Sequence, residues 1–140
     1  MRLSVFSPES SSQLFIDLRK IYQDYFTDEQ LTTESLQTLI ENEHSQLYVT
    51  MFNERHLGAV QVTVIEDQAQ LRLLTVRDLT RRKGIAKNLL REVEKQLKME
   101  DVSEVKMELK EIKEEEKEGL ILFMQACGYQ LSGDIFSKDL

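Results

Sequence analysis

The sequence predicts a single domain of the α/β (α+β) class over residues 1–140, in which helices cover both faces of a mixed, mostly antiparallel sheet. Three observations support this prediction. A chain of 140 residues suits one domain with one core. Three strand-like segments follow one another in the middle of the chain, and such neighbours usually pair antiparallel. Helix-like and strand-like segments then alternate, which implies crossover connections over the faces of a sheet.

The first third of the chain predicts one short strand and two helices. Residues 2–6 form the strand, and Ser10, Ser11 or Ser12 can cap a helix that runs to about residue 25. Its core-facing side chains recur at helical spacing and are Leu14, Leu18, Ile21, Tyr22 and Tyr25. A second, shorter helix is expected over residues 33–43, and its inward side chains are Leu36, Leu39 and Ile40.

The middle of the chain predicts a hairpin, a third strand and a long helix. Residues 47–52 and 57–64 are rich in β-branched and aromatic side chains, and the polar residues 53–56 separate them. The third strand, residues 71–76, follows a turn near Asp67. An amphipathic helix is then expected from about residue 84 to 98, with its apolar face formed by Ile85, Leu89, Leu90, Val93 and Leu97.

The last third predicts a strand over residues 102–109, a helix over residues 114–127 and a closing strand over residues 129–136. Gly128 is expected to end the helix as its C-cap. The predicted order of elements is therefore β-α-α-β-β-β-α-β-α-β.

Composition excludes several classes of protein. The net charge of −7 argues against a general nucleic-acid binder. No apolar run approaches the roughly 18 residues needed to cross a bilayer, so no membrane partner is expected. Residues 1–8 lack the order of a signal peptide, and Cys127 is the only cysteine, which excludes an internal disulfide. Together these features predict a cytoplasmic protein.

A basic segment stands out within this acidic chain, and it holds Arg72, Arg77, Arg81, Arg82, Lys83, Lys87 and Arg91. Its loop, residues 77–83, connects the third strand of the middle region to the amphipathic helix that opens at Gly84. The first N–H groups of a helix are unpaired and carry partial positive charge, so they can bind a pyrophosphate. Gly84 has no Cβ and allows a phosphate oxygen to approach. The segment predicts a small-anion site, although charge alone would also fit a solvated loop.

The loop also carries a family resemblance. Arg81, Gly84 and Ala86 match in register the Arg/Gln-x-x-Gly-x-Gly/Ala pyrophosphate loop of the GNAT acetyltransferase superfamily, between a strand and a helix as in that superfamily. The resemblance implies acetyl-CoA (or CoA) as ligand. The implied contacts in the loop are Thr80, Arg81, Arg82, Lys83, Gly84, Ile85, Ala86 and Lys87. The preceding strand would offer backbone groups to the pantetheine arm at Leu74, Thr75 and Val76.

The residue that many GNAT enzymes use as general acid is absent. That acid is a tyrosine four residues before the Gly-aromatic pair of the last helix. Here the pair is Gly128-Tyr129 and the position holds Met124, whose thioether cannot donate a proton. His44 and His56 are expected to be exposed in or beside turns, and Cys127 to be a small buried hydrophobic residue. No catalytic residue and no metal site is assigned, and enzymatic activity stays open.

Longer stretches resemble one small GNAT family, the PanZ (PanM) factors, which mature and regulate aspartate 1-decarboxylase in an acetyl-CoA-dependent way. The stretches cover residues 17–22, 48–64, 76–84 and 123–126. The family also carries methionine at the position of Met124. The resemblance implies a protein that binds the decarboxylase precursor with acetyl-CoA, promotes the self-cleavage that forms its pyruvoyl group, and regulates pantothenate and CoA biosynthesis.

The same resemblance implies a partner surface for the precursor and the mature enzyme. It consists of Met51, Phe52 and Asn53, together with Arg77 and Arg81 near the CoA loop. Met51 departs from the family, which carries arginine there. An ordinary hairpin turn is the other interpretation of residues 53–56. Two functions stay open: this ligand-dependent regulator, and an N-acetyltransferase acting on an amine of a small molecule or protein.

Overall fold

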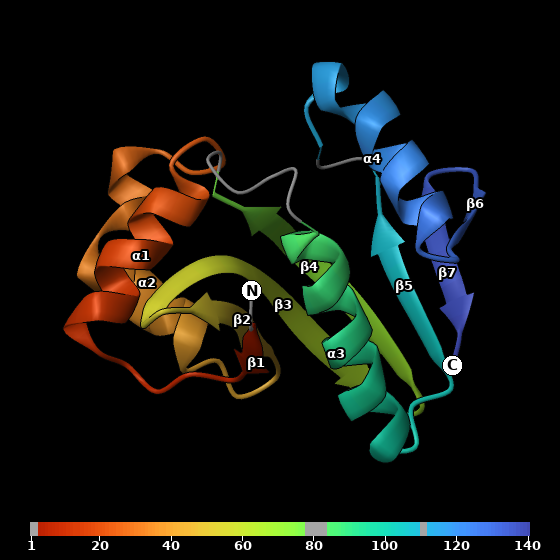
Figure 1. Cartoon of the computed structure of the whole chain (residues 1–140), viewed down its shortest axis with the longest axis horizontal. Coiled ribbons are helices and arrows are strands. Elements are labelled where there is room, and N and C mark those ends of the chain that lie inside the picture. The colour runs from red at the N-terminus through yellow and green to blue at the C-terminus, as the bar shows by residue number, and fades with distance from the viewer. Residues whose placement is uncertain (1–2, 78–83, 110–111) are drawn as a thin grey trace.

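The computed structural model describes residues 3–77, 84–109 and 112–140, and in these residues the chain forms a seven-stranded sheet flanked by helices (Figure 1). The elements in chain order are β1 (Ser4–Phe6), α1 (Ser12–Tyr22), η1 (Asp28–Leu31), α2 (Thr33–Ile40), β2 (Gln46–Phe52), β3 (Arg55–Ile65), β4 (Gln68–Val76), α3 (Ile85–Met99), β5 (Glu104–Glu108), α4 (Glu114–Ala126), β6 (Gln130–Ser132) and β7 (Ile135–Asp139). The strand order is β1-β2-β3-β4-β5-β7-β6, and the β4–β5 pair is parallel while the others are antiparallel. The predicted mixed, mostly antiparallel sheet is confirmed.

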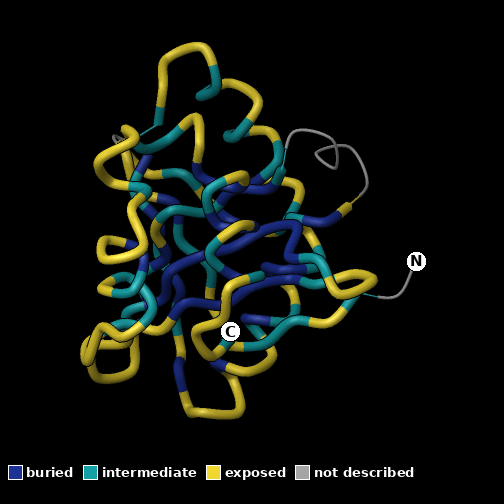
Figure 2. Tube along the Cα trace, turned by 90° about the vertical axis from the view of Figure 1, so that its left-hand side faces the viewer, coloured by how far each residue is buried: buried dark blue, intermediate teal, exposed yellow. Residues whose placement is uncertain are grey.

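Helices cover both faces of the sheet, as predicted. On one face α1 and α2 pack against β2 and β3, in a cluster of Leu14, Leu18, Ile21, Tyr22, Leu36, Leu47, Val49 and Ala59. On the other face α3 and the end of α4 pack against the central strands, in a cluster that includes Leu89, Leu90, Val93, Met124, Val60, Val62, Leu71, Val105 and Met107. Figure 2 shows the buried segments running through the middle of the domain, with exposed turns around them.

Helix α1 begins where the serines predicted it, but it ends earlier than expected. The Ser11 side chain caps the helix by accepting a 3.1 Å hydrogen bond from the Leu14 N–H. At the other end, the N–H groups of Tyr25 and Phe26 both donate to the Tyr22 carbonyl, at 2.9 and 3.0 Å. The chain therefore turns after Tyr22, and the prediction of a helix to residue 25 was wrong. The turn places Tyr25 and Phe26 after the helix and beside Leu73 and Leu74 of β4.

The closing segment is a hairpin, so the prediction of one strand over residues 129–136 was also wrong. Strands β6 and β7 pair antiparallel with Leu131 opposite Phe136, and β7 lies between β5 and β6. Gly133 stands in the turn with φ +61°, a backbone conformation that glycine adopts without steric cost. The Gly133-Asp134 pair is a turn signal that the sequence does carry.

Strand β4 pairs with β3 along its whole length on one side, but it diverges from β5 on the other side. Its pairing with β3 continues to Val76 opposite Gly58. In the part of the chain that the structure describes, its pairing with β5 ends at Leu71 opposite Met107. Beyond this point the two strands separate, and Figure 1 shows the resulting V-shaped opening between β4 and β5. Among the described residues, no strand pairs with β4 on the β5 side over residues 73–76.

Candidate functional site

A β-bulge lies in β4 directly beyond the point of divergence. Arg72 pairs with Gln61 and Thr75 pairs with Ala59, so that Leu73 and Leu74 together stand opposite Val60. Leu73 has φ +58°, in the left-handed region that bulky residues rarely adopt. The bulge changes the direction in which side chains point: Leu71 packs in the α3-side cluster, whereas Leu73 packs against the α1–α2 cluster.

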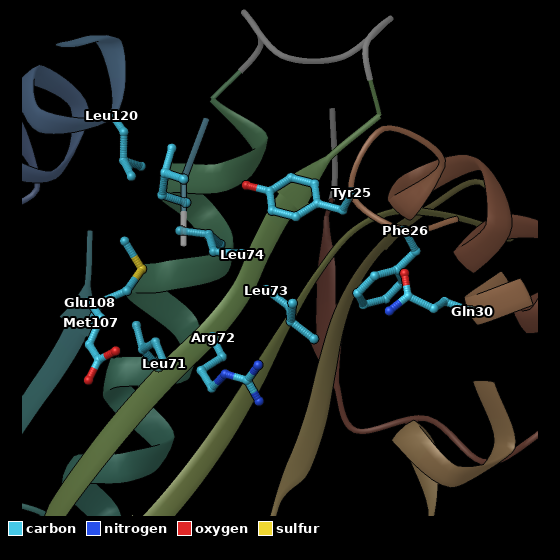
Figure 3. A pocket seen from close by; sticks show the side chains of 11 residues that line it. Tyr25, Phe26, Gln30, Leu71, Arg72, Leu73, Leu74, Met107, Glu108 and Leu120 are labelled. Carbon is cyan, nitrogen blue, oxygen red and sulfur yellow. The ribbon is translucent and has the colours of Figure 1, made fainter. Parts of the chain in front are cut away.

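Two adjoining hollows run along this edge of β4. The first, of about 390 Å³, lies between β4 and α4, and its lining includes Leu74, Thr75, Val76, Ala86, Glu116, Gly119, Leu120 and Phe123. The second, of about 220 Å³, lies around the bulge, and its lining includes Phe26, Gln30, Leu71, Arg72, Leu73, Met107 and Glu108 (Figure 3). Both hollows are lined by Tyr25, Leu74, Ile112 and Leu120, so they adjoin each other along β4. We call the two hollows together the β4–α4 groove.

The N-terminus of α3 lies at one end of this groove. Ile85 is fully buried and packs with Leu57 and Val76, which fixes the start of the helix beside the end of β4. Gly84 is the N-cap, with φ +72° and no side-chain cap hydrogen bond. Among the described residues, no atom would lie within 4 Å of a Cβ at Gly84. Such a helix start attracts an anion through its free N–H groups and its dipole.

The structure brings together part of the predicted acetyl-CoA contacts. Leu74, Thr75, Val76 and Ala86 line the groove. Gly84 and Lys87 lie at the helix start beside it, whereas the Ile85 side chain is in the core, which leaves only its backbone for a ligand. The remaining predicted contacts, Thr80, Arg81, Arg82 and Lys83, lie outside the described residues. Their roles stay predictions.

Several groove residues were not predicted to line a site. Tyr25 was expected to face the core from α1, but it follows the helix and lines both hollows. In Figure 3 its side chain reaches across β4, with the hydroxyl on the side of Leu74 and Leu120. The wall formed by α4, with Gly119, Leu120 and Phe123, was also missed. No local signal marks these residues, because strand divergence and not a motif brings them together.

No proton donor occupies the position of the usual GNAT acid. Met124 is fully buried in the core. The nearby Tyr129 is also buried, and its hydroxyl donates to the Glu94 carboxylate at 2.8 Å. Burial, followed by the charge of Glu94, raises the pKa of Tyr129 well above its usual value. Cys127 is half-buried rather than buried as expected, and burial followed by Glu94 raises the pKa of its thiol.

The structure corrects the expectation for one histidine. His44 is exposed, as predicted, but His56 is only 6% exposed. Its backbone N–H donates to Asp17 Oδ2 at 2.9 Å, and its ring Nδ1 lies 2.7 Å from the same oxygen. Arg55 donates to Asp17 Oδ1 through Nε at 3.0 Å and through a terminal guanidinium nitrogen at 2.8 Å, and Gln13 donates to that oxygen at 3.0 Å. The partner on α1, 39 residues away in sequence, explains why a residue beside a turn is buried.

The Asp17 carboxylate is the centre of this network, and its side chain is fully buried. Burial by itself raises the pKa of Asp17. The hydrogen bonds from Arg55, from the His56 backbone and ring, and from Gln13 outweigh burial and bring the pKa to about 2. Asp17 therefore stays ionised in the folded protein and ties α1 to the start of β3.

The predicted partner residues form the tip of the β2–β3 hairpin. Asn53 and Glu54 both have positive φ, 53° and 66°, as in a two-residue hairpin turn. Phe52 is 37% exposed beside the turn, and Met51 is half-buried. The Arg77 N–H donates to the Leu57 carbonyl at 2.8 Å, which places Arg77 near the tip of this hairpin. Arg81 lies outside the described residues. Contact with a partner stays a prediction.

Two features are absent from the residues that the structure describes. Across residues 3–77, 84–109 and 112–140, no helix has the length and apolar character needed to cross a membrane. Within the same stretches, no three His, Cys, Asp or Glu side chains gather so that they could hold a metal ion.

Sequence comparison places these features beside known proteins. The chain matches the family described as "Acetyltransferase (GNAT) domain, PanZ" over residues 3–137. It is 32% identical over 139 residues to the PanD regulatory factor of Salmonella typhimurium, covering 99% of each chain. It is 38% identical over 94 residues to the PanD regulatory factor of Escherichia coli, covering 66% of this chain and 67% of that protein.

Structure comparison agrees with the sequence. The solution structure of the putative N-acetyl transferase YhhK from Escherichia coli bound to coenzyme A superposes with a TM-score of 0.78, at 30% identity and with both chains fully covered. The PaiA N-acetyltransferase of Thermoplasma acidophilum, in complex with coenzyme A, superposes with a TM-score of 0.73 at 16% identity over the full length of both chains. The second likeness is one of fold.

Proposed function

Because the chain belongs to the PanZ family of GNAT acetyltransferase domains, we propose that it binds acetyl-CoA and regulates PanD, the aspartate 1-decarboxylase, by promoting self-cleavage of the precursor. The observation that carries this proposal is the β4–α4 groove, which runs from the start of α3 to the β4 bulge. Two relatives are named PanD regulatory factors, and the structure of YhhK contains coenzyme A. We place this activity in the cytoplasm, in keeping with the single cysteine.

Acetyl-CoA would lie along the groove with its diphosphate at the start of α3 and its acetyl group towards the β4 bulge. Its diphosphate would accept hydrogen bonds from the N–H groups at the start of α3, next to Gly84 and Ala86. Lys87 would add charge, as would Arg81, Arg82 and Lys83 of the preceding loop, and Thr80 would add a hydroxyl. The pantetheine arm would take the place of a strand partner. It would pair with the free edge of β4 at Leu74, Thr75 and Val76. The acetyl group would then lie near the bulge.

The chain would act on its partner through binding rather than through a catalytic side chain. The position of the usual acid holds the buried Met124. Self-cleavage of the precursor is an acyl shift at one of its own serines, so a binding protein can promote it by favouring a reactive backbone geometry. Because binding free energies are linked, a partner that binds better with acetyl-CoA present also tightens acetyl-CoA binding by the same factor.

The position of the hairpin supports a partner surface that depends on the bound ligand. Val76 lines the groove and pairs in register with Gly58, and the adjacent Arg77 bonds to Leu57. Leu57 is two residues from Arg55, where the hairpin tip ends. A ligand on β4 and a partner on Met51, Phe52 and Asn53 would therefore lie at the same end of the sheet, with β3 between them.

The proposal is tested by mixing unprocessed aspartate 1-decarboxylase with this protein, with and without acetyl-CoA, and following precursor cleavage on a gel. We expect cleavage to accelerate only when both are added. Unchanged cleavage, in the presence of acetyl-CoA binding measured by calorimetry, would contradict the regulatory function.

An N-acetyltransferase acting on an amine of a small molecule or protein is the second candidate function. The hollow around the bulge favours it, because this space continues past Leu74 to Glu108 and could admit an acceptor. Thiol release from acetyl-CoA that rises with an amine acceptor would identify this activity. No release across a broad panel of amines would reject it.

The partner surface can be tested at Phe52, the exposed aromatic residue of the hairpin tip. Phe52→Ser is expected to weaken decarboxylase binding by roughly tenfold, because exposed aromatic residues contribute strongly to interfaces. Ile65→Ser is the control, since Ile65 is 67% exposed at the other end of β3. Affinity measured by calorimetry with acetyl-CoA present should fall for the first variant alone. Equal affinities for both variants and the unchanged protein would show that Phe52 does not belong to the partner surface.

A further inference from the structure

Tyr22 on α1 makes a hydrogen bond that core packing does not require. The side chain is fully buried among α1, α2 and the sheet. Its hydroxyl donates to the Leu73 carbonyl at 2.9 Å, across 51 residues of sequence. Phenylalanine would fill the same space without placing a polar group in the core, where a hydroxyl is costly unless it is bonded. The hydroxyl therefore has a role at Leu73.

Leu73 is the residue of β4 that most needs such a bond. It lies in the bulge, where Leu73 and Leu74 have no register partner in the β3–β4 ladder. Its φ of +58° is unfavourable for leucine, and such conformations persist only where the surroundings hold them. The Tyr22 hydroxyl satisfies the carbonyl of this residue and anchors it to α1.

The position of the hydroxyl is itself fixed by neighbouring rings. Tyr22 contacts the rings of Phe26 and Tyr25, with centroids 5.2 and 6.4 Å away. Burial, followed by a smaller contribution from Tyr25, raises the pKa of Tyr22 far above its usual value. The hydroxyl thus remains a neutral donor across the physiological pH range. Tyr25 lines both hollows of the groove, so this group of rings also borders the ligand site.

We propose that Tyr22 is a positioning residue for acetyl-CoA: its hydroxyl holds the β4 bulge, and through it the free backbone edge of residues 74–76, in the shape that receives the pantetheine arm. Tyr22 would not touch the ligand. This inference rests on the proposed function, because it assumes that acetyl-CoA lies along β4.

The test is Tyr22→Phe, with Tyr48→Phe as the matched control. Tyr48 is also buried, at 6% exposure, but its hydroxyl donates to the Gln46 side chain, away from the bulge. Loss of one hydrogen bond to a partly buried carbonyl should lower acetyl-CoA affinity by roughly 3- to 10-fold in Tyr22→Phe. Tyr48→Phe should bind acetyl-CoA as the unchanged protein does. Calorimetry measures both affinities.

A second ligand separates positioning from general destabilisation. The nucleotide half of the coenzyme, 3′-phospho-ADP, carries the diphosphate but has no pantetheine arm. Its affinity should be the same in Tyr22→Phe and in the unchanged protein, because the start of α3 is not altered. Amide hydrogen exchange at Leu74, Thr75 and Val76 should become faster in Tyr22→Phe.

The outcomes are distinguishable. Failure of the unchanged protein to bind acetyl-CoA would overturn the proposed function and the inference with it. Wild-type affinity in Tyr22→Phe, or an equal loss for acetyl-CoA and 3′-phospho-ADP, would overturn the inference alone. Unchanged amide exchange at residues 74–76 would also contradict it.

Discussion

Replacement of Gly84 by valine is expected to lower acetyl-CoA affinity by at least roughly 100-fold while the fold is retained. Gly84 has φ +72°, which a β-branched residue adopts only with strain. The added side chain would also project from the start of α3, where the diphosphate is proposed to bind. Both effects act on the helix start, whose free N–H groups are the proposed anion site. Calorimetric titration with acetyl-CoA measures the loss.

The control for this substitution is Gly133→Val in the β6–β7 turn. Gly133 also has positive φ, +61°, and a Cβ there would likewise have no described atom within 4 Å. The two variants carry similar backbone strain, but Gly133 is not among the residues that line the groove. We expect similar melting temperatures for the two variants and normal acetyl-CoA affinity in Gly133→Val. Full affinity in Gly84→Val would contradict the placement of the diphosphate.

Replacement of Asp17 by alanine is expected to lower the free energy of unfolding by roughly 1–3 kcal/mol, the usual cost of leaving buried hydrogen-bonding groups without their partner. The carboxylate is fully buried and accepts hydrogen bonds from Arg55, His56 and Gln13. Its loss leaves these donors without their acceptor. Urea unfolding measures the change.

Glu92→Ala is the control, since Glu92 pairs with Lys95 at 3.4 Å on the exposed surface of α3. Such a pair contributes less than about 1 kcal/mol. A change of similar size in Asp17→Ala would show that the Asp17 network adds little to stability.

The same network should make stability depend on acid pH. The pKa of Asp17 is about 2 in the folded protein, below its ordinary value of 3.8. A lowered folded-state pKa stabilises the protein above the unfolded value, and this contribution is lost as pH falls towards 2. The difference in unfolding free energy between the unchanged protein and Asp17→Asn should therefore shrink between pH 4 and pH 2, which urea unfolding at each pH would show. A constant difference would contradict the lowered pKa.

Most elements of the fold could be predicted from the sequence, because the spacing of apolar residues reports which face of an element is buried. Helix α3 shows this in its regular row from Ile85 to Leu97. The bulge could not be predicted, because Leu73 and Leu74 are the same residue type and hide the change of side-chain direction. The burial of His56 could not be predicted either, since it depends on Asp17, which lies in a different element.

The candidate site divides in the same way. The start of α3 was predicted, because its residues are contiguous and Gly84 and Ala86 form a motif. The opposite wall of the groove comes from α4 and from Tyr25, which the divergence of β4 and β5 brings near each other. No pattern of neighbouring residues in the sequence predicts that divergence.

The free edge of β4 has a consequence for the lifetime of the protein without ligand. Unpaired strand edges are sites at which other chains can add and aggregate, and soluble proteins usually cover them. Here the cover would be a metabolite. At an acetyl-CoA concentration 100 times its Kd, binding would add about 2.7 kcal/mol to the free energy of unfolding. A cell short of acetyl-CoA would thus hold a protein that opens more often and is degraded sooner, so its abundance would follow the supply of acetyl-CoA.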